Sequence, residues 1–175
     1  MAVKMKKCAI TSLAATIVLT VLFLIMQWRI FETLAITFGT TAYHFWIRLL
    51  IGYAFDSKMK NHAEYHKRWY QVGTLEKTIY EKLKVKTWKN KMPTYDMDAF
   101  DIRQHTWDEI AQATCQSELV HEANVFLSFV PIFSSRWFGA LPVFMITSVL
   151  AAFYDLLFVM MQRYNRARII KILKG

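Results

Sequence analysis

The sequence predicts an all-α integral membrane protein with about four membrane segments and an amphipathic, cytoplasmic region at the membrane interface. Residues 8–28 and 34–55 form nearly charge-free runs of 21 and 22 residues. Each run can cross a hydrocarbon layer about 30 Å thick at a helical rise of about 1.5 Å per residue. Of the 175 residues, 55% are apolar and only five are glycine. A single membrane domain is therefore expected, and a soluble globule or a disordered chain is excluded.

The first two spans are expected to form a tight helical hairpin. The run over 8–28 follows three lysines, as a signal peptide would, but a signal peptide has a shorter apolar region that ends at small residues. This run ends in Met26, Gln27 and Trp28, which favours an uncleaved anchor. Only a few residues separate it from the span over 34–55, so both outer ends return to the same side.

A polar segment over residues 56–105 follows the hairpin. Within it, residues 57–71 and 74–83 are predicted to form short helices. Tryptophans and tyrosines alternate with lysines along this segment, a mixture favoured where lipid headgroups meet acyl chains. We expect the segment to lie on the inner leaflet, and the alternative is a small cytoplasmic subdomain with ordinary core aromatics.

Two further apolar segments and a basic tail complete the predicted membrane domain. Thr106 and Glu109 have the spacing of a capping box, which predicts a helix over 106–133 that enters the membrane. Residues 137–161 form the last span, and residues 162–175 form a basic tail.

The distribution of charge predicts the topology. With four membrane segments and both termini on one side, 19 lysines and arginines fall on that side, against Arg29 and Arg136 on the other. The positive-inside rule then predicts a multi-pass protein of the cell membrane with both termini in the cytoplasm. This topology also accounts for the net charge of +9. Nucleic-acid binding is not expected, because the sequence contains no recognisable reading module.

Three ionisable residues cluster at the entrance to the third apolar segment. Glu118, His121 and Glu122 are three or four positions apart and therefore share a helix face. Ionisable groups at such a depth are costly and usually mark a site. A carboxylate that accepts from one imidazole nitrogen raises the basicity of the other. The alternative is a polar helix face that contacts headgroups or caps the segment over 56–105.

Ionisable residues also lie within the spans themselves. His44 and Arg48 are four residues apart in the second span, and Asp155 lies in the last. Their burial demands partners. We expect Arg48 and Asp155 to form a structural pair, with a role in the acceptor pocket as the alternative.

Several motifs follow one another in the order and spacing of a known family. The sequence resembles the glycosyl-4,4'-diaponeurosporenoate acyltransferase family of staphyloxanthin-type carotenoid biosynthesis over about residues 80–174. The matching motifs are the K-x-W-K-x-K run within Lys84–Pro93, Asp101-x-Arg103, Glu118-Leu119-x-His121, Pro131 and the QRYNRxR run from Gln162 to Arg168. The chain departs from the pattern at Glu122, where the family has an aromatic residue, and at Ala167, where it has proline.

The resemblance implies transfer of a fatty acyl group from a thioester donor to a hydroxyl of a membrane lipid or glycolipid, such as a glycosylated carotenoid. Acyl transfer needs a base for the attacking hydroxyl. We hypothesise that His121 is this base and that Glu118 orients its ring. The donor would be acyl-CoA or an acyl-carrier protein.

Ten further residues are candidates for binding the donor or the acceptor. Forked guanidinium groups suit phosphate oxygens, but basic residues after a last span also serve as a stop-transfer anchor. Tryptophan and lysine residues could equally be interfacial anchors. The candidates are Arg163, Tyr164, Asn165, Arg166, Arg168, Trp88, Lys89, Lys91, Arg103 and Glu122.

Other chemistries have weaker support in the sequence. No metal or cofactor is expected, because the HExxH motif, glycine-rich phosphate loops and paired CxxC cysteines are absent. Two alternatives to the acyltransferase are a non-enzymatic membrane subunit that binds a partner or lipid, and a small membrane methyltransferase. The oligomeric state is left open.

Overall fold

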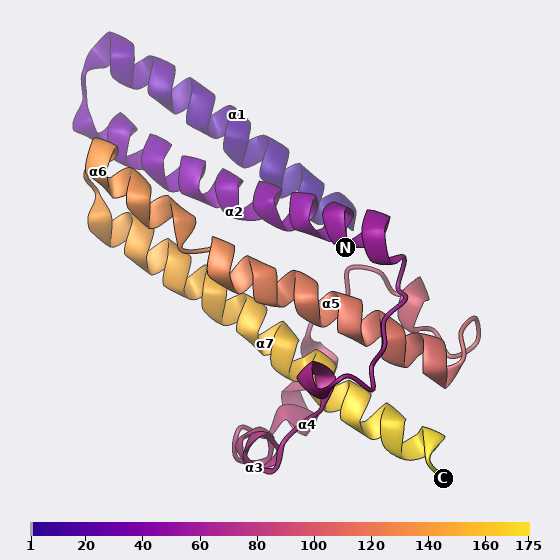
Figure 1. Cartoon of the computed structure of the whole chain (residues 1–175). Coiled ribbons are helices and arrows are strands. Elements are labelled where there is room, and N and C mark those ends of the chain that lie inside the picture. Colours follow the sequence, from indigo (N-terminus) through magenta and orange to yellow (C-terminus); the bar gives the residue numbers. More distant parts are fainter. Residues whose placement is uncertain (1) are drawn as a thin grey trace. The chain divides into compact units, whose positions relative to one another are not determined.

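The computed structural model describes residues 2–175, and all of its regular structure within this range is helical (Figure 1). The long helices are α1 (Ala2–Met26), α2 (Arg29–Met59), α5 (Trp107–Leu127) and α7 (Leu141–Leu173). The short elements are the helices α3 (Thr74–Lys82), α4 (Val85–Trp88) and α6 (Ser135–Phe138) and the 3-10 turns η1 (Arg68–Tyr70), η2 (Lys89–Lys91), η3 (Asp98–Phe100) and η4 (Val130–Ser134). The predicted all-α class is confirmed.

The described chain divides into two compact units. One contains residues 2–51 and 124–154, and the other contains residues 52–123 and 155–175. Helices α2, α5 and α7 each contribute residues to both units. All the candidate site residues belong to the second unit, which is therefore described in more detail below.

The first unit contains the predicted helical hairpin. Helices α1 and α2 are joined at Gln27, whose φ of 56° reverses the chain, so the turn falls earlier than the predicted gap between 28 and 34. The helices approach closely at Gly39, where an added Cβ would lie 3.4 Å from Thr16. The hydroxyl of Thr16 donates to the carbonyl of Ser12 at 2.8 Å. Such bonds satisfy hydroxyl groups within apolar helices.

Side-chain to backbone bonds tie the hairpin to the rest of the first unit. The Tyr43 hydroxyl donates to the carbonyl of Leu127 at 2.9 Å, and Arg48 Nη2 donates to the carbonyl of Ala151 at 3.1 Å. Helix α5 ends at Leu127, and Pro131 lies in the 3-10 turn that follows it. The predicted helix over 106–133 is therefore continuous only as far as residue 127.

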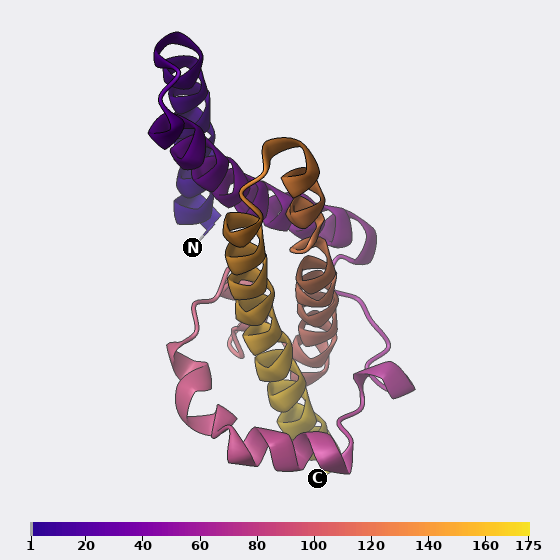
Figure 2. The ribbon, with the colours of Figure 1, turned by 90° about the vertical axis from the view of Figure 1, so that its left-hand side faces the viewer.

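The second unit packs the start of α5 against the end of α7. Its core includes Tyr65, Tyr70, Cys115 and Ile169. Helix α3 lies across the C-terminal part of α7 (Figures 1 and 2). Its bounds confirm the predicted helix over 74–83.

The predicted helix over 57–71 is wrong. Helix α2 continues to Met59, and Lys60 and Asn61 then take positive φ angles of 47° and 60°, which end it. From there to the turn η1, the chain crosses α5 in irregular conformation. The amide of Ala63 donates to the side chain of Gln112 at 3.2 Å, which gives this non-helical backbone a partner.

Three of the described helices are long and apolar enough to cross a membrane: α1, α2 and α7. This indicates a membrane-embedded protein. Helix α5 is not among them, so the predicted count of four is not confirmed. Helix α7 runs on to Leu173, so most of the basic segment predicted as a tail is a helical extension of the last span.

Candidate functional site

Helix α5 begins at the predicted capping box. The amide of Thr106 donates to the Glu109 carboxylate at 2.8 Å, and the amide of Glu109 donates back to the Thr106 hydroxyl at 3.3 Å. These bonds satisfy two amides that a helix start leaves without partners. The box sets the register with which α5 presents Glu118 and His121.

Glu118 is a fully buried carboxylate held by two arginines of α7. Its exposed fraction is 0%, and Arg163 Nη1 lies 2.5 Å from Oε1. Arg166 Nη2 forms an ion pair with Oε2. A buried carboxylate is tolerated only when it is paired in this way. The three side chains form a cluster that we call the Glu118 node.

Arg163 uses all five of its guanidinium N–H groups within the protein. Nε donates to Glu76 at 2.5 Å, and Nη2 donates to Glu76 at 3.0 Å and to the carbonyl of Gln71 at 3.0 Å. Nη1 donates to Glu118 and, at 2.9 Å, to the carbonyl of Trp69. No donor is left over for a ligand, so this side chain joins α3, α5 and α7.

Arg166 is enclosed more completely. Its exposed fraction is 0%, and its Nε and Nη2 donate to the carbonyl of Tyr70 at 3.2 and 2.9 Å. The guanidinium also lies over the Tyr70 ring, 5.0 Å from its centroid. These contacts place Arg166 inside the protein, which differs from both expectations for it, phosphate binding and stop-transfer anchoring.

Glu76 is the second carboxylate bound to Arg163. Partial burial favours its protonated form, but hydrogen bonds from Arg163 and Tyr80 outweigh this and hold the pKa of Glu76 below its usual range. Tyr80 donates its hydroxyl to the same carboxylate. Since neither residue stood out in the sequence, this half of the cluster was missed. No local motif marks a pair 87 positions apart.

His121 lies one turn beyond Glu118 but has a different partner. Its Nδ1 is 2.8 Å from Oδ1 of Asp155 on α7, and Asp155 is 1% exposed. The imidazole ring also stacks on Phe158, with 4.4 Å between centroids and 7° between planes. The predicted orienting role of Glu118 is therefore corrected, because Asp155 holds the ring while Glu118 binds arginines.

The His121–Asp155 pair leaves one imidazole nitrogen for other chemistry. A carboxylate accepts hydrogen bonds, so the neutral ring donates from Nδ1 and presents Nε2 as an acceptor. The His121 side chain is 21% exposed, so it is not sealed inside the protein. The sequence-based expectation for Asp155 is a structural pair with Arg48, with a role in the acceptor pocket as the alternative. An aspartate within a span was nevertheless the signal available for it.

Three further candidates are Glu122 on α5, Trp88 on α4 and Arg103 before the start of α5. Trp69 Nε1 donates to Glu122 at 3.1 Å, and Trp88 Nε1 donates to the carbonyl of Leu83 at 3.0 Å. Arg103 is exposed, and its backbone amide donates to Asp101 at 2.9 Å. These contacts do not join Trp88 or Arg103 to the His121–Asp155 pair.

Three other candidates form a positively charged cluster beside the end of α7. Lys89 Nζ lies 5.9 Å from the centroid of the Tyr164 ring. Burial and the nearby positive charge of Arg168 lower the pKa of Lys89. Arg168 is exposed. Lysine and arginine held near one another can bind an anion between them. Lys91 is exposed and Asn165 half-buried in the same region.

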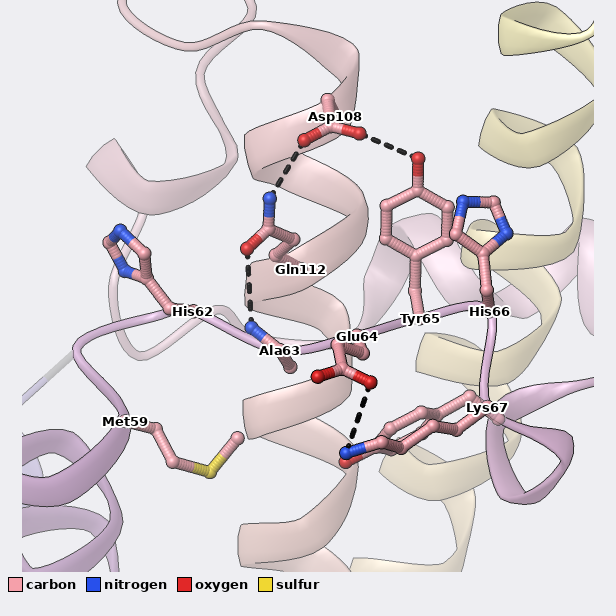
Figure 3. Close-up of a pocket in the computed structure, with 10 residues that line it drawn as sticks. Met59, His62, Ala63, Glu64, Tyr65, His66, Lys67, Asp108 and Gln112 are labelled. Carbon is pink, nitrogen blue, oxygen red and sulfur yellow. Dashed lines mark hydrogen bonds and ion pairs between the residues drawn. The ribbon is translucent and has the colours of Figure 1, made fainter.

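The second unit also has two cavities. The larger, of about 640 Å³, lies where residues 59–67 cross the first turns of α5 (Figure 3). There the Asp108 carboxylate accepts bonds from Tyr65 at 2.6 Å and Gln112 at 2.7 Å, and these bonds hold its pKa below the usual range. None of the predicted site residues lines this cavity. The smaller, of about 450 Å³, is lined by Arg68, Trp69, Gln71 and Arg163.

The described residues do not form a candidate metal site. Over residues 2–175, no group of three or more histidine, cysteine, aspartate or glutamate side chains is placed to hold a metal ion. His62 and His66, whose spacing would suit a metal, both border the larger cavity instead. His62 Nδ1 lies 2.7 Å from the carbonyl of Lys60.

Comparison with known proteins gives one match. A family model described as glycosyl-4,4'-diaponeurosporenoate acyltransferase matches residues 66–175, a range that begins earlier than the predicted resemblance. No curated protein and no solved structure matches the chain. The matched range holds the Glu118 node, the His121–Asp155 pair and the cluster around Lys89. Because it covers more than half of the 175 residues, the chain belongs to the glycosyl-4,4'-diaponeurosporenoate acyltransferase family.

Proposed function

We propose that the protein transfers a fatty acyl group from a thioester donor to a hydroxyl of a membrane lipid, with His121 as the general base. The observation that carries this proposal is the 2.8 Å contact between His121 Nδ1 and the buried Asp155. It fixes the tautomer in which Nε2 accepts a proton, as a base for acyl transfer requires. Family membership supports an acyltransferase of carotenoid biosynthesis.

The proposed step needs only the two substrates and the His121–Asp155 pair. The acceptor hydroxyl oxygen attacks the thioester carbonyl carbon while Nε2 of His121 takes the hydroxyl proton. The C–O bond forms, the C–S bond breaks, and the thiolate leaves and takes up that proton. Asp155 stabilises the positive charge that the imidazole carries between these events.

The depth of the pair suits an acceptor dissolved in lipid. Asp155 precedes Arg163 by eight residues on α7, or about 12 Å along the helix axis. Arg163 comes just after the apolar part of that helix ends. With both termini in the cytoplasm, as the charge distribution predicts, the pair lies below the cytoplasmic surface, where a membrane-embedded hydroxyl is accessible.

The cluster formed by Lys89, Tyr164 and Arg168 is the proposed contact for the donor. Acyl-CoA and the phosphopantetheine of a carrier protein both bring phosphate, which guanidinium and ammonium groups bind. Lys91, Arg103, Trp88 and Asn165 remain proposed contributors to substrate binding. Arg163 and Arg166 are paired with carboxylates inside the protein. We therefore give the Glu118 node a structural role, which is to hold α7 in place next to the donor contact.

The test is acyl transfer by His121→Gln and Asp155→Asn variants in proteoliposomes that contain radiolabelled acyl-CoA and a glycolipid acceptor extract. We expect His121→Gln to lose about 10²–10⁴-fold in turnover, and Asp155→Asn to lose less, with a shifted pH profile. His105→Gln, which removes an exposed imidazole before α5, should retain full turnover. Near-normal turnover of His121→Gln would refute the proposal.

A further inference from the structure

The inner face of helix α3 carries a half-buried Glu76 and a buried Tyr80, whereas its leucine and isoleucine side chains are exposed. Its inner face presents Glu76, bound to Arg163, and Tyr80, which is 5% exposed and packs edge-on against Tyr164 with 6.4 Å between ring centroids. This face is fastened to α7 by charge and hydrogen bonds. A surface helix usually packs its aliphatic stripe on the core, and α3 does not.

The apolar side chains of α3 form a separate stripe. Leu75, Ile79 and Leu83 recur every fourth residue and therefore share one face, and they are 81%, 50% and 49% exposed. Lys77 and Glu81 lie on the opposite side of the helix and are also exposed. A contiguous apolar stripe on a helix otherwise rich in charge is the pattern of a helix that lies in a membrane surface.

The charge around this stripe suits an anionic surface. Glu76 is neutralised by Arg163, which leaves Glu81 as the one acidic side chain without such a partner between residues 74 and 91. The same stretch carries six lysines, namely Lys77, Lys82, Lys84, Lys86, Lys89 and Lys91. Lysines beside an apolar stripe are attracted to anionic lipid headgroups.

The attachment to α7 sets the depth of α3. Arg163 follows Met161, the last residue of the apolar run in α7, by two positions, or about 3 Å along the axis. The bonds from Arg163 to Glu76, at 2.5 and 3.0 Å, hold α3 at that level. Where the apolar part of α7 ends, headgroups and the outer acyl chains begin.

We propose that α3 docks on the anionic lipid leaflet around the protein, with the Leu75–Ile79–Leu83 face inserted among acyl chains and Lys77 and Glu81 facing water. The occupant of the exposed stripe is thus lipid of the bilayer in which α7 is embedded. The hydrogen bonds of Glu76 and Tyr80 fix α3 in the orientation that exposes the stripe. This inference stands independently of the proposed reaction.

The test places an environment-sensitive fluorophore on each face of α3. Leu75→Cys and Lys77→Cys are made in a Cys8→Ser background, in which Cys115 is buried and protected from the label. Labelled protein is reconstituted in nanodiscs of phosphatidylcholine with phosphatidylglycerol. We expect blue-shifted emission at position 75 with at least twofold quenching by lipids that carry a nitroxide on the acyl chain. Position 77 should emit as in water.

Each outcome decides the proposal. A fluorophore at Ile79→Cys should behave like the one at position 75. Removal of phosphatidylglycerol should weaken the nitroxide quenching at positions 75 and 79. Equal emission from positions 75 and 77, or no quenching by the nitroxide lipids, would overturn lipid docking. A blue shift at position 75 that rises with protein concentration and resists the nitroxide lipids would instead indicate a second copy of the chain on this face.

Discussion

Glu118 and His121 lie one turn apart on α5, yet their surroundings differ in kind. Glu118 is fully buried, and both of its oxygens are paired with arginines. His121 is partly exposed and has one nitrogen bound to a buried carboxylate. A group whose bonding capacity is filled inside the protein holds elements together, whereas a group with an available lone pair can act on something else. Glu118 therefore has a structural role, and His121 is the residue for which we propose a chemical one.

The largest expected effect on stability is at Glu118. Glu118→Gln removes the one counter-charge of the buried Arg166 guanidinium and leaves Arg163 with Glu76 alone, so it should lower the free energy of unfolding by about 3–5 kcal/mol. His121→Gln loses one hydrogen bond to a carboxylate and should cost about 1.5–3 kcal/mol. Denaturation of the purified variants in detergent micelles measures both. Equal losses of unfolding free energy would contradict a structural role that is specific to Glu118.

A smaller difference in stability is expected between lysine substitutions at Arg166 and at Arg168. Arg166→Lys cannot keep the bonds to Tyr70 and Glu118 together, because an ammonium group lacks the planar fork. Its unfolding free energy should fall by about 1.5–3 kcal/mol. Arg168→Lys changes an exposed side chain and should stay within about 0.5 kcal/mol. Equal thermal midpoints for the two variants would contradict the buried role of Arg166.

The smallest expected effect is on the pH dependence of stability. The pKa values of Glu76 and Asp108 are held below their usual ranges, so each carboxylate binds fewer protons in the folded state. Their contribution is complete above about pH 5 and is lost as the pH falls through the lowered folded-state values. Thermal midpoints measured from pH 6 to pH 3 should decline less steeply in Glu76→Gln than in the parent. An unchanged slope would show that Glu76 contributes nothing.

Local signals in the sequence predicted much of the fold. Hydropathy predicted the apolar runs of α1, α2 and α7, and the Thr106–Glu109 spacing correctly predicted the start of α5. The predicted helix after Met59 was wrong. Residues with positive φ end the helix there, and the sequence has no glycine or proline at this point that would predict the end.

The partners of the ionisable residues could not be read from spacing. Helical periodicity correctly placed Glu118 and His121 on α5 and made them neighbours, but it could not show that α7 offers each of them a different partner. The contacts to Arg163 and Asp155 are 45 and 34 positions apart in sequence. Pairing at such separation depends on how two helices pack, and only a structure supplies that.

The arginine that joins three helices comes late in the chain, at position 163 of 175. During synthesis, the carboxylates of Glu76 and Glu118 are therefore made long before their shared counter-charge leaves the ribosome. Until then α5 carries an unneutralised acid on the face that will later be buried. The segment that carries Arg163 thus completes assembly, and a product truncated before this residue would expose an acidic defect that quality-control proteases can recognise.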